Sequence, residues 1–276
     1  MISLRHIKKF GPVQALRRER YRRRFESPEG YTMHSGVFRS FDEAAASVPH
    51  ATGCNHATIS AEFEDKIDRV FPYDYPFLFW LQRIFSNSAA SSLVDIGGHI
   101  GVHYYAYRKF LELPRKLKWL VVELAEIAKA GQERAERLAA PGLSFTTSLE
   151  ILNSHPTDII LSSGALHYIE KPLLWNAIAR MESKPQHILL NKVPLYQGED
   201  FVSLQNVRPG FSPLYVWNRL EFIRKFEHTG YRLVDEWSVP ERHFHIFDDP
   251  LRSFGSFSGL YLRLDSVDDH QVSPAP

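Results

Sequence analysis

The stretch SLVDIGGHIG, residues 92–101, constrains the fold of this chain more than any other. Residues 92–96 form a short, mostly apolar run that is typical of a buried strand, and a helical pattern begins after Gly101. Glycines at 97, 98 and 101 allow a sharp backbone turn and the close approach of a ligand to the main chain. A strand, a glycine-rich turn and a helix in this order are typical of the first unit of a nucleotide-binding α/β sheet.

The spacing of these glycines distinguishes between nucleotide ligands. A dinucleotide-binding turn requires Gly-x-Gly-x-x-Gly, but Ile96 stands where the first glycine is needed. The chain has acid-x-Gly-x-x-x-Gly instead, formed by Asp95, Gly97 and Gly101. This pattern resembles the first motif of class I S-adenosylmethionine (SAM) methyltransferases, in which a further glycine usually stands at the position of His99. The His99 side chain must therefore find room where that motif normally has none.

Segments with strand and helix patterns alternate regularly from residue 92 to residue 264. Helices between strands imply right-handed parallel crossovers, whereas the last two strands have no helix between them and should pair antiparallel. The order and number of segments predict an α/β fold with a Rossmann-like, seven-stranded class I methyltransferase sheet whose last strand is antiparallel. The predicted strands cover 92–96, 118–122, 143–147, 158–163, 187–191, 231–239 and 259–264, and the predicted helices cover 100–113, 125–139, 173–181 and 219–228.

Helical patterns also precede the sheet. Ser40, with Glu43 three residues later, forms a capping box that predicts the start of a short helix. Apolar residues at helical spacing predict a second helix over residues 56–70, and a strongly apolar helix over residues 77–85. We therefore expect a basic arm and an N-terminal helical cap over residues 1–88, a SAM-binding methyltransferase domain over 89–265 and a flexible tail over 266–276.

Charge is distributed unevenly along the chain. Residues 1–24 contain nine lysines and arginines and a single glutamate, and the whole chain carries a net charge of +1. The body that follows the arm is therefore acidic. A basic arm of this kind could bind nucleic acid or an anionic membrane surface. The alternative, which we favour, is a solvated helix or frayed tail that folds against the acidic body.

The composition is that of a water-soluble globular protein, with 44% hydrophobic and 24% charged residues. No apolar run reaches the roughly 20 residues that a membrane-spanning helix needs. The N-terminus lacks the apolar segment of a signal peptide. Cys54 is the only cysteine, so an intramolecular disulfide and a cysteine zinc cluster are both excluded. These observations favour a cytoplasmic protein.

The candidate cofactor-binding residues follow from the position of the strand ends. In an open α/β sheet, a ligand binds outside the carboxyl ends of the strands. Glu123 ends the second strand, where a carboxylate can accept hydrogen bonds from both hydroxyls of a ribose; alternatively it is a surface acid that favours a helix start. The ends of the third and fourth strands would contact the adenine and the methionine end of SAM. The predicted cofactor-binding residues are Asp95, Gly97, Gly98, Gly101, Glu123, Leu124, Ser148, Leu149, Ser162 and Ser163.

His167 is the candidate catalytic base. It follows the fourth strand, and its near-neutral reference pKa suits the removal of a proton from a substrate hydroxyl or amine. The alternative is a histidine that packs a helix start and hydrogen-bonds the backbone. His243 and His245 could share one strand face, but no third ligand is paired with them, so we expect no metal site. The predicted substrate-binding residues are Tyr75, His103, Tyr104, Tyr168 and His243.

With these residues in place, the chain resembles a bacterial family of class I SAM-dependent methyltransferases whose members are largely uncharacterised. The similarity covers roughly residues 30–264. The sequence motifs that carry it are Gly30-Tyr31, the segment 38–44 (FRSFDEA), the segment 95–105 around the glycine turn, Val122-Glu123, and the segment 160–172 (ILSSGALHYIEKP). The chain departs from the family at His99, where a small residue is usual, and at Asn191, near which members often have an acid and a base.

The resemblance implies SAM as the cofactor. Our hypothesis is an enzyme, a cytoplasmic SAM-dependent methyltransferase of secondary metabolism. It would transfer a methyl group to an oxygen or nitrogen of a small-molecule or glycan-precursor acceptor. Two alternatives are a nucleic-acid methyltransferase that uses the basic arm, and a SAM-binding partner protein without catalysis. The acidic body argues against a nucleic-acid partner, we expect no membrane span, and a homodimer stays open.

Overall fold

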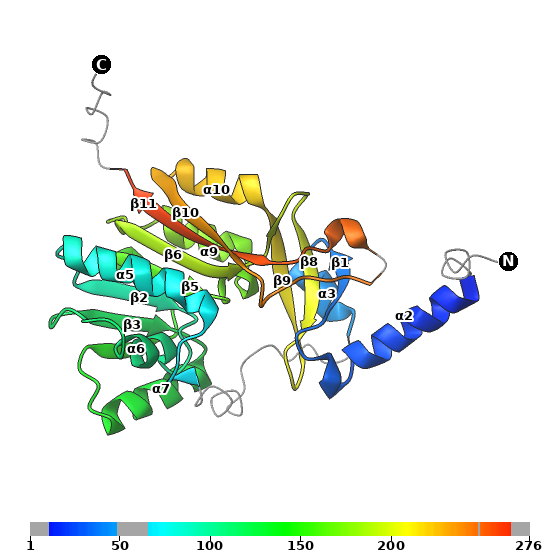
Figure 1. Cartoon of the computed structure of the whole chain (residues 1–276), viewed down its shortest axis with the longest axis horizontal. Coiled ribbons are helices and arrows are strands. Elements are labelled where there is room, and N and C mark those ends of the chain that lie inside the picture. Colours follow the sequence, from blue (N-terminus) through cyan, green and yellow to red (C-terminus); the bar gives the residue numbers. More distant parts are fainter. Residues whose placement is uncertain (1–10, 49–65, 248, 266–276) are drawn as a thin grey trace, which may run out of the picture.

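The computed structural model describes residues 11–48, 66–247 and 249–265, and its strands form two sheets (Figure 1). The larger sheet contains β2 (Ser92–Ile96), β3 (Lys118–Val122), β4 (Leu143–Thr146), β5 (Ile159–Ser163), β6 (His187–Val193), β10 (Tyr231–Val239) and β11 (Phe257–Leu264). Their order across the sheet is β10-β11-β6-β5-β2-β3-β4. The pairs from β6 to β4 are parallel, whereas β11 is antiparallel to both β6 and β10. The predicted class I methyltransferase sheet is confirmed.

The parallel strands are buried because helices cover both faces of the sheet. All five residues of β2 are buried, and alternate side chains enter different cores. Leu93 belongs to the core on one face, and Val94 and Ile96 belong to the core on the other. The first core includes residues of α5 (Tyr75–Asn87), α6 (Val102–Tyr107) and α7 (Ala125–Arg137); the second includes residues of α8 (Ile151–Ser154), α9 (Lys171–Ala179) and α10 (Arg219–Glu227).

The predicted boundaries agree closely with the structure for most of these elements. The first two strands coincide with β2 and β3, and α7 and α10 end within two residues of their predicted ends. The predicted helix over 100–113 is wrong in length, because α6 ends at Tyr107 and turn-type hydrogen bonds follow, such as Lys109 N–H to the carbonyl of Ala106.

A second sheet, which the sequence analysis did not predict, lies beside the carboxyl ends of the first (Figure 1). It contains β1 (His34–Phe38), β7 (Leu195–Tyr196), β8 (Phe201–Asn206) and β9 (Phe211–Asn218). The strand order is β1-β8-β9-β7, and the hairpin of β8 and β9 lies between β6 and α10 in the sequence. Only residues 202–205 (VSLQ) alternate apolar and polar side chains, although Pro209-Gly210 is a turn signal.

The described part of the N-terminal cap contains a strand as well as helices. The predicted capping box is present at α3 (Phe41–Ala46), where Ser40 Oγ accepts a hydrogen bond from Glu43 N–H at 3.1 Å. β1 pairs antiparallel with β8, however, so the cap is not purely helical. Of the predicted helix over 56–70, residues 56–65 lie outside the described part, and residues 66–70 form no α-helix.

A long basic helix, α2 (Gly11–Phe25), precedes this sheet and extends away from the main body (Figure 1). Its last residue, Phe25, is 2% exposed and packs in a small core with Val202 and Leu204 of β8. The side-chain amide of Asn206 donates hydrogen bonds to the carbonyls of Phe25 and Ser27, at 2.6 and 3.0 Å. The end of α2 is therefore held by the second sheet. Among the described residues, no helix is long and apolar enough to cross a membrane.

Candidate active site

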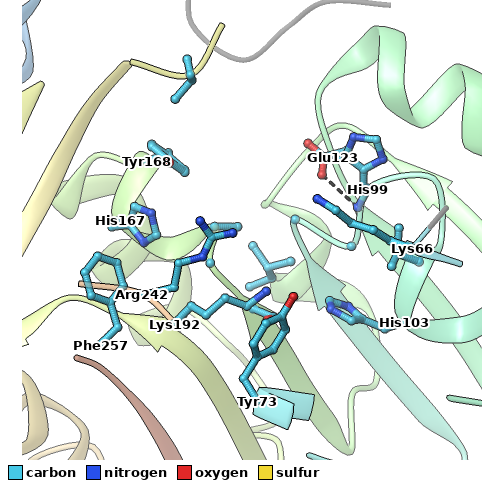
Figure 2. A pocket seen from close by; sticks show the side chains of 18 of the residues that line it. Lys66, Tyr73, His99, His103, Glu123, His167, Tyr168, Lys192, Arg242 and Phe257 are labelled. Atoms are coloured by element: carbon cyan, nitrogen blue, oxygen red, sulfur yellow. Dashed lines mark hydrogen bonds between the residues drawn. The ribbon is translucent and has the colours of Figure 1, made fainter. Parts of the chain in front are cut away.

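A cavity of about 630 Å³ opens at the carboxyl ends of β2, β3, β5 and β6. Its volume falls within the roughly 300–1,000 Å³ that is usual for small-molecule sites. The turns after β2, β3 and β5 form one part of the wall, and residues of β1, β8 and the loop after β10 form another. Figure 2 shows Glu123 and His99 on one side of this space and His167, Arg242 and Lys192 on the opposite side.

The glycine turn after β2 lines the cavity through Gly97 and Gly98. Gly97 has a φ of +74°, and a Cβ built on it would lie 2.1 Å from the Cβ of Ala165. Gly101 also has a left-handed φ of +88° and caps the start of α6, but it does not line the cavity. Two of the three predicted glycines thus face the site, and the third shapes the turn that leads into α6.

We expect Gly97→Ala to destabilise the fold by about 2–3 kcal/mol, because the left-handed backbone strains any residue with a Cβ and the new methyl overlaps Ala165. Gly255→Ala is the matched control, because nothing lies within 4 Å of the added Cβ. Urea unfolding of both variants measures the difference. A Gly97→Ala protein as stable as the control would show that the turn rearranges at little cost.

Asp95 is fully buried and does not line the cavity. Its Oδ2 lies 2.9 Å from Nδ1 of His103 and accepts a hydrogen bond from Nε1 of Trp119 at 3.3 Å. His103 does line the cavity, as predicted for the substrate side. Asp95 therefore orients a cavity residue instead of reaching the cavity itself.

Glu123 lines the cavity at the end of β3, beside the glycine turn. Its two carboxylate oxygens accept hydrogen bonds from main-chain N–H groups, one from His99 at 3.1 Å and one from Leu124 at 2.9 Å. Burial raises the pKa of this carboxyl group, and the two N–H donors oppose that shift. The carboxylate is thus held in one orientation by the backbone on both sides of it.

His99 finds its room next to Glu123. The residue has a left-handed φ of +56°, and its side chain is buried and lines the cavity beside the Glu123 carboxylate (Figure 2). Burial lowers the pKa of the His99 imidazole to about 3, so the ring is neutral near pH 7. A histidine at this position therefore adds bulk to the cofactor side of the cavity without adding charge.

The other predicted cofactor residues divide into two groups. Leu124, Leu149 and Ser163 line the cavity. Ser148 and Ser162 do not: Ser148 Oγ accepts a hydrogen bond from Glu150 N–H at 3.2 Å, and Ser162 Oγ donates one to the carbonyl of Ile96 at 2.9 Å. These two hydroxyls are satisfied by neighbouring backbone, so they serve the turn after β4 and the pairing of β5 with β2.

The predicted substrate residues divide in the same way. His103, Tyr168 and His243 line the cavity, but Tyr75 and Tyr104 do not. Tyr75 is 59% exposed on the first turn of α5. The Tyr104 hydroxyl donates a hydrogen bond to the carbonyl of Pro141 at 3.0 Å, within the core under α6 and α7. Both tyrosines lie on helices, and their positions on these helices direct the side chains away from the cavity. The sequence did not indicate which face of each helix would line the site.

His167 lines the cavity and is almost enclosed, with 4% of its surface exposed. Its ring packs against Tyr168, with ring centroids 4.2 Å apart, and meets the edge of Phe257 at 6.2 Å. Its Nδ1 is buried, and no described residue hydrogen-bonds it. Burial, with smaller effects of His34, Arg242 and Lys192, lowers the pKa of His167 to about 3.

The burial of His167 predicts a pH effect on stability. An unfolded histidine titrates near pH 6.5, so below this pH the unfolded chain binds a proton that folded His167 refuses. The free energy of unfolding must then fall as the pH falls from 6.5 towards 3. We expect His167→Gln to make the free energy of unfolding less dependent on pH between pH 6 and 5. The loss of one titrating group should reduce the slope by up to about 1.4 kcal/mol per pH unit. Urea unfolding across that range tests it, with exposed His228→Gln as the control; equal slopes would contradict it.

Four cationic residues of the cavity, Lys66, Arg69, Lys192 and Arg242, were missed from the sequence. Lys192 lies at the carboxyl end of β6 and Arg242 follows β10, so the rule that selected Glu123 could have selected these two. His34 and Gln205 also line the cavity. They come from the second sheet, and nothing in the sequence indicated that this sheet reaches the site.

Asn191, where the chain departs from the resembling family, organises this region. Its side-chain amide donates a hydrogen bond to the carbonyl of Tyr73 at 2.7 Å. Its Oδ1 accepts hydrogen bonds from Lys192 N–H at 3.0 Å and from Nε1 of Trp237 at 3.2 Å. Asn191 therefore positions the residues around it and does not itself line the cavity.

A metal site does not emerge from these residues. No group of three His, Cys, Asp or Glu side chains within the described ranges could hold a metal ion. His243 lines the cavity, whereas His245 lies against Tyr21 of α2, with ring centroids 6.2 Å apart.

No protein-family model and no curated protein sequence matches the chain. Solved methyltransferases resemble it in fold. A SAM-dependent methyltransferase from Aquifex aeolicus is 12% identical, with 77% of this chain and 100% of that chain covered and a TM-score of 0.48. The 1,6-didemethyltoxoflavin-N1-methyltransferase of Burkholderia thailandensis, solved with S-adenosylhomocysteine (SAH), is 13% identical over 79% of this chain and 94% of that chain, with a TM-score of 0.47. The magnesium protoporphyrin IX methyltransferase of Synechocystis PCC 6803, also solved with SAH, is 11% identical over 91% and 99%, with a TM-score of 0.47. At these values the likeness carries no argument about what this chain binds.

Proposed function

We propose that the chain is a SAM-dependent methyltransferase that acts on an oxygen or nitrogen of a small-molecule or glycan-precursor acceptor. The observation that carries the proposal is the position of Glu123. It ends β3, next to the glycine turn after β2, in a cavity at the carboxyl ends of the parallel strands. That edge is where open α/β sheets bind nucleotide ligands, and a fixed carboxylate suits a ribose diol.

The residues around Glu123 fit such a cofactor. The Glu123 carboxylate is held by the N–H groups of His99 and Leu124, and it remains on the cavity wall. The side chains of Leu124, Ile127 and Leu149 add apolar wall suited to an adenine ring. Gly97 and Gly98 bring main chain without side chains to the same wall. In this arrangement Glu123 would hold the ribose, the apolar residues the adenine and the glycine turn the methionine part.

SAM supplies an electrophilic methyl group when bound. The protein's contribution is to hold the acceptor atom in line with that group and to remove a proton when the nucleophile is a hydroxyl. We assign proton removal to His167, whose neutral imidazole lies across the cavity from Glu123 (Figure 2). Its Nδ1 is enclosed by the protein, so Nε2 would receive the proton. The second sheet and the loop after β10 would exclude water from the acceptor.

The test of the proposal is isothermal titration of the full chain with SAM, SAH and NAD. We expect micromolar binding of SAM and SAH and no binding of NAD, because Ile96 replaces the first glycine of a dinucleotide turn. Binding of NAD in preference to SAH would overturn the proposal. Binding of SAH without methyl transfer to any acceptor in a broad screen would favour a SAM-binding partner protein.

A further inference from the structure

The half of the cavity opposite Glu123 carries two cations, Lys192 and Arg242. Lys192 follows Asn191 near the end of β6, and Arg242 stands in the turn after β10. Both line the cavity, and Figure 2 shows their side chains directed toward the same space as His167. None of the described ion pairs includes either residue, although surface pairs such as Arg219 with Glu236 do form nearby in the chain.

Backbone hydrogen bonds position Arg242, and an unusual backbone conformation and a ring contact position Lys192. Arg242 N–H donates a hydrogen bond to the carbonyl of Val239 at 3.1 Å, and its own carbonyl accepts one from Phe257 N–H at 2.9 Å. Lys192 has a left-handed φ of +55°, which costs energy in any residue with a side chain. Its Nζ lies 4.2 Å from the centroid of the Tyr73 ring. Strain and fixation of this kind are typical of functional sites.

Two acids of the cavity, Asp74 and Glu241, raise the pKa of Lys192 and so favour its charged form, but neither forms a described ion pair with Lys192 or Arg242. Asp74 accepts hydrogen bonds from the Tyr107 hydroxyl at 3.0 Å and from Phe71 N–H at 2.8 Å. Glu241 is exposed, and Glu123 lies on the far side (Figure 2). Burial is the largest cause of the lowered pKa values of Lys192, His34 and His167, and Arg242 lowers each of them further. This half of the cavity therefore disfavours additional positive charge.

We propose that Lys192 and Arg242 bind an anionic group of the acceptor, a carboxylate or a phosphate. The inference rests on the proposed methyl transfer at this cavity and names the class of acceptor. A guanidinium presents two parallel N–H donors to such a group, and a lysine adds a point charge. A partly buried charge is stabilised by a paired opposite charge, and none of the described ion pairs includes either cation. Phe257, Tyr168 and Tyr73 supply aromatic walls beside the cations, which suits a planar acid.

An anionic acceptor would also affect the basicity of His167. Lys192 and Arg242 both disfavour the protonated form of this imidazole. Burial is the largest cause of the lowered pKa and would persist, but an anion bound between the two cations would oppose their smaller effects and raise the pKa of His167. His167 would therefore be a stronger base with an anionic acceptor than with a neutral one.

The experiment is a titration of the full chain with matched probes, with and without saturating SAH. The probes are 4-hydroxybenzoate, its neutral analogue 4-hydroxybenzamide, and phenyl phosphate, which separates a carboxylate from a phosphate preference. We expect at least one anion to bind about 10-fold or more tightly than the amide, a difference of about 1.4 kcal/mol. This preference should disappear in Lys192→Met and in Arg242→Met, while SAH affinity stays within about twofold of wild type. The exposed Lys129→Met and Arg180→Met should retain it.

Thermal unfolding of the same variants provides a second readout. Removing a partly buried cation that forms no ion pair should leave the Tm nearly unchanged or raise it, whereas a marked fall would indicate a structural role and overturn the assignment. Equal affinity for acid and amide, or no binding of either anion to a protein that binds SAH, would also overturn it. Anion binding without SAH binding would support the anion site and refute the proposed cofactor.

Discussion

Glu123→Ala is expected to weaken SAH binding about 100-fold or more. The carboxylate would lose its hydrogen bonds to the two ribose hydroxyls, and bonds to a charged group contribute about 1.5–3 kcal/mol each. Isothermal titration with SAH measures the loss. Glu126→Ala removes an exposed acid in the first turn of α7, three residues after Glu123; this matched control should bind SAH as wild type does.

Impaired folding of Glu123→Ala would also lower its SAH affinity. Alanine at 123 leaves the N–H groups of His99 and Leu124 without their carboxylate partner, so thermal unfolding must accompany the titration. Glu123→Gln retains one acceptor oxygen for them and should bind SAH with intermediate affinity. An unchanged affinity in a folded Glu123→Ala protein would refute the ribose role of Glu123 and, with it, the observation that carries the proposed function.

His167→Ala is expected to lower methyl transfer about 100- to 1,000-fold for a hydroxyl acceptor identified in a screen of small acids, because the variant lacks the proposed general base. SAH affinity should stay unchanged, since His167 lies across the cavity from Glu123 (Figure 2). Steady-state rates and the pH dependence of kcat/KM measure the effect. His228→Ala removes an exposed histidine at the end of α10 and should have the activity of the wild type.

Two outcomes would contradict the assignment of His167 in different ways. Unchanged turnover would mean that His167 only packs against Tyr168 and Phe257, and Lys192, whose pKa burial lowers to about 8, would become the next candidate for the base. A parallel loss of turnover and SAH affinity would indicate a structural role, because a general base acts on the transition state and not on cofactor binding.

The larger sheet could be predicted from the sequence because its information is local. A buried parallel strand is a short apolar run, and a helix between two strands implies a parallel crossover. The glycine turn after β2 and the position of Glu123 at the end of β3 follow from the same patterns, and both are found on the cavity wall. The capping box at Ser40 was equally readable, since its two partners are only three residues apart.

The acceptor side depended on contacts between segments far apart in the chain. β1 pairs with β8 across more than 160 residues, and this pairing is what brings His34 and Gln205 to the cavity. No period-two pattern specifies which distant strand is the partner, because partner choice depends on how the whole core packs. The sequence therefore indicated a purely helical cap where the structure has a helix-and-strand layer.

The direction of individual side chains was also decided by packing. Asp95 stands in the predicted motif, yet its carboxylate turns inward to His103 and Trp119. Tyr104 lies within the predicted first helix, but its hydroxyl donates a hydrogen bond to the carbonyl of Pro141 in the core. The sequence by itself determined the alternation of strands and helices, the nucleotide-type turn and the carboxylate after the second strand, since these are encoded in neighbouring residues. Only the tertiary structure decided that Lys192, Arg242 and His167 meet in one cavity, because their convergence results from burial and from strand pairing between distant parts of the chain.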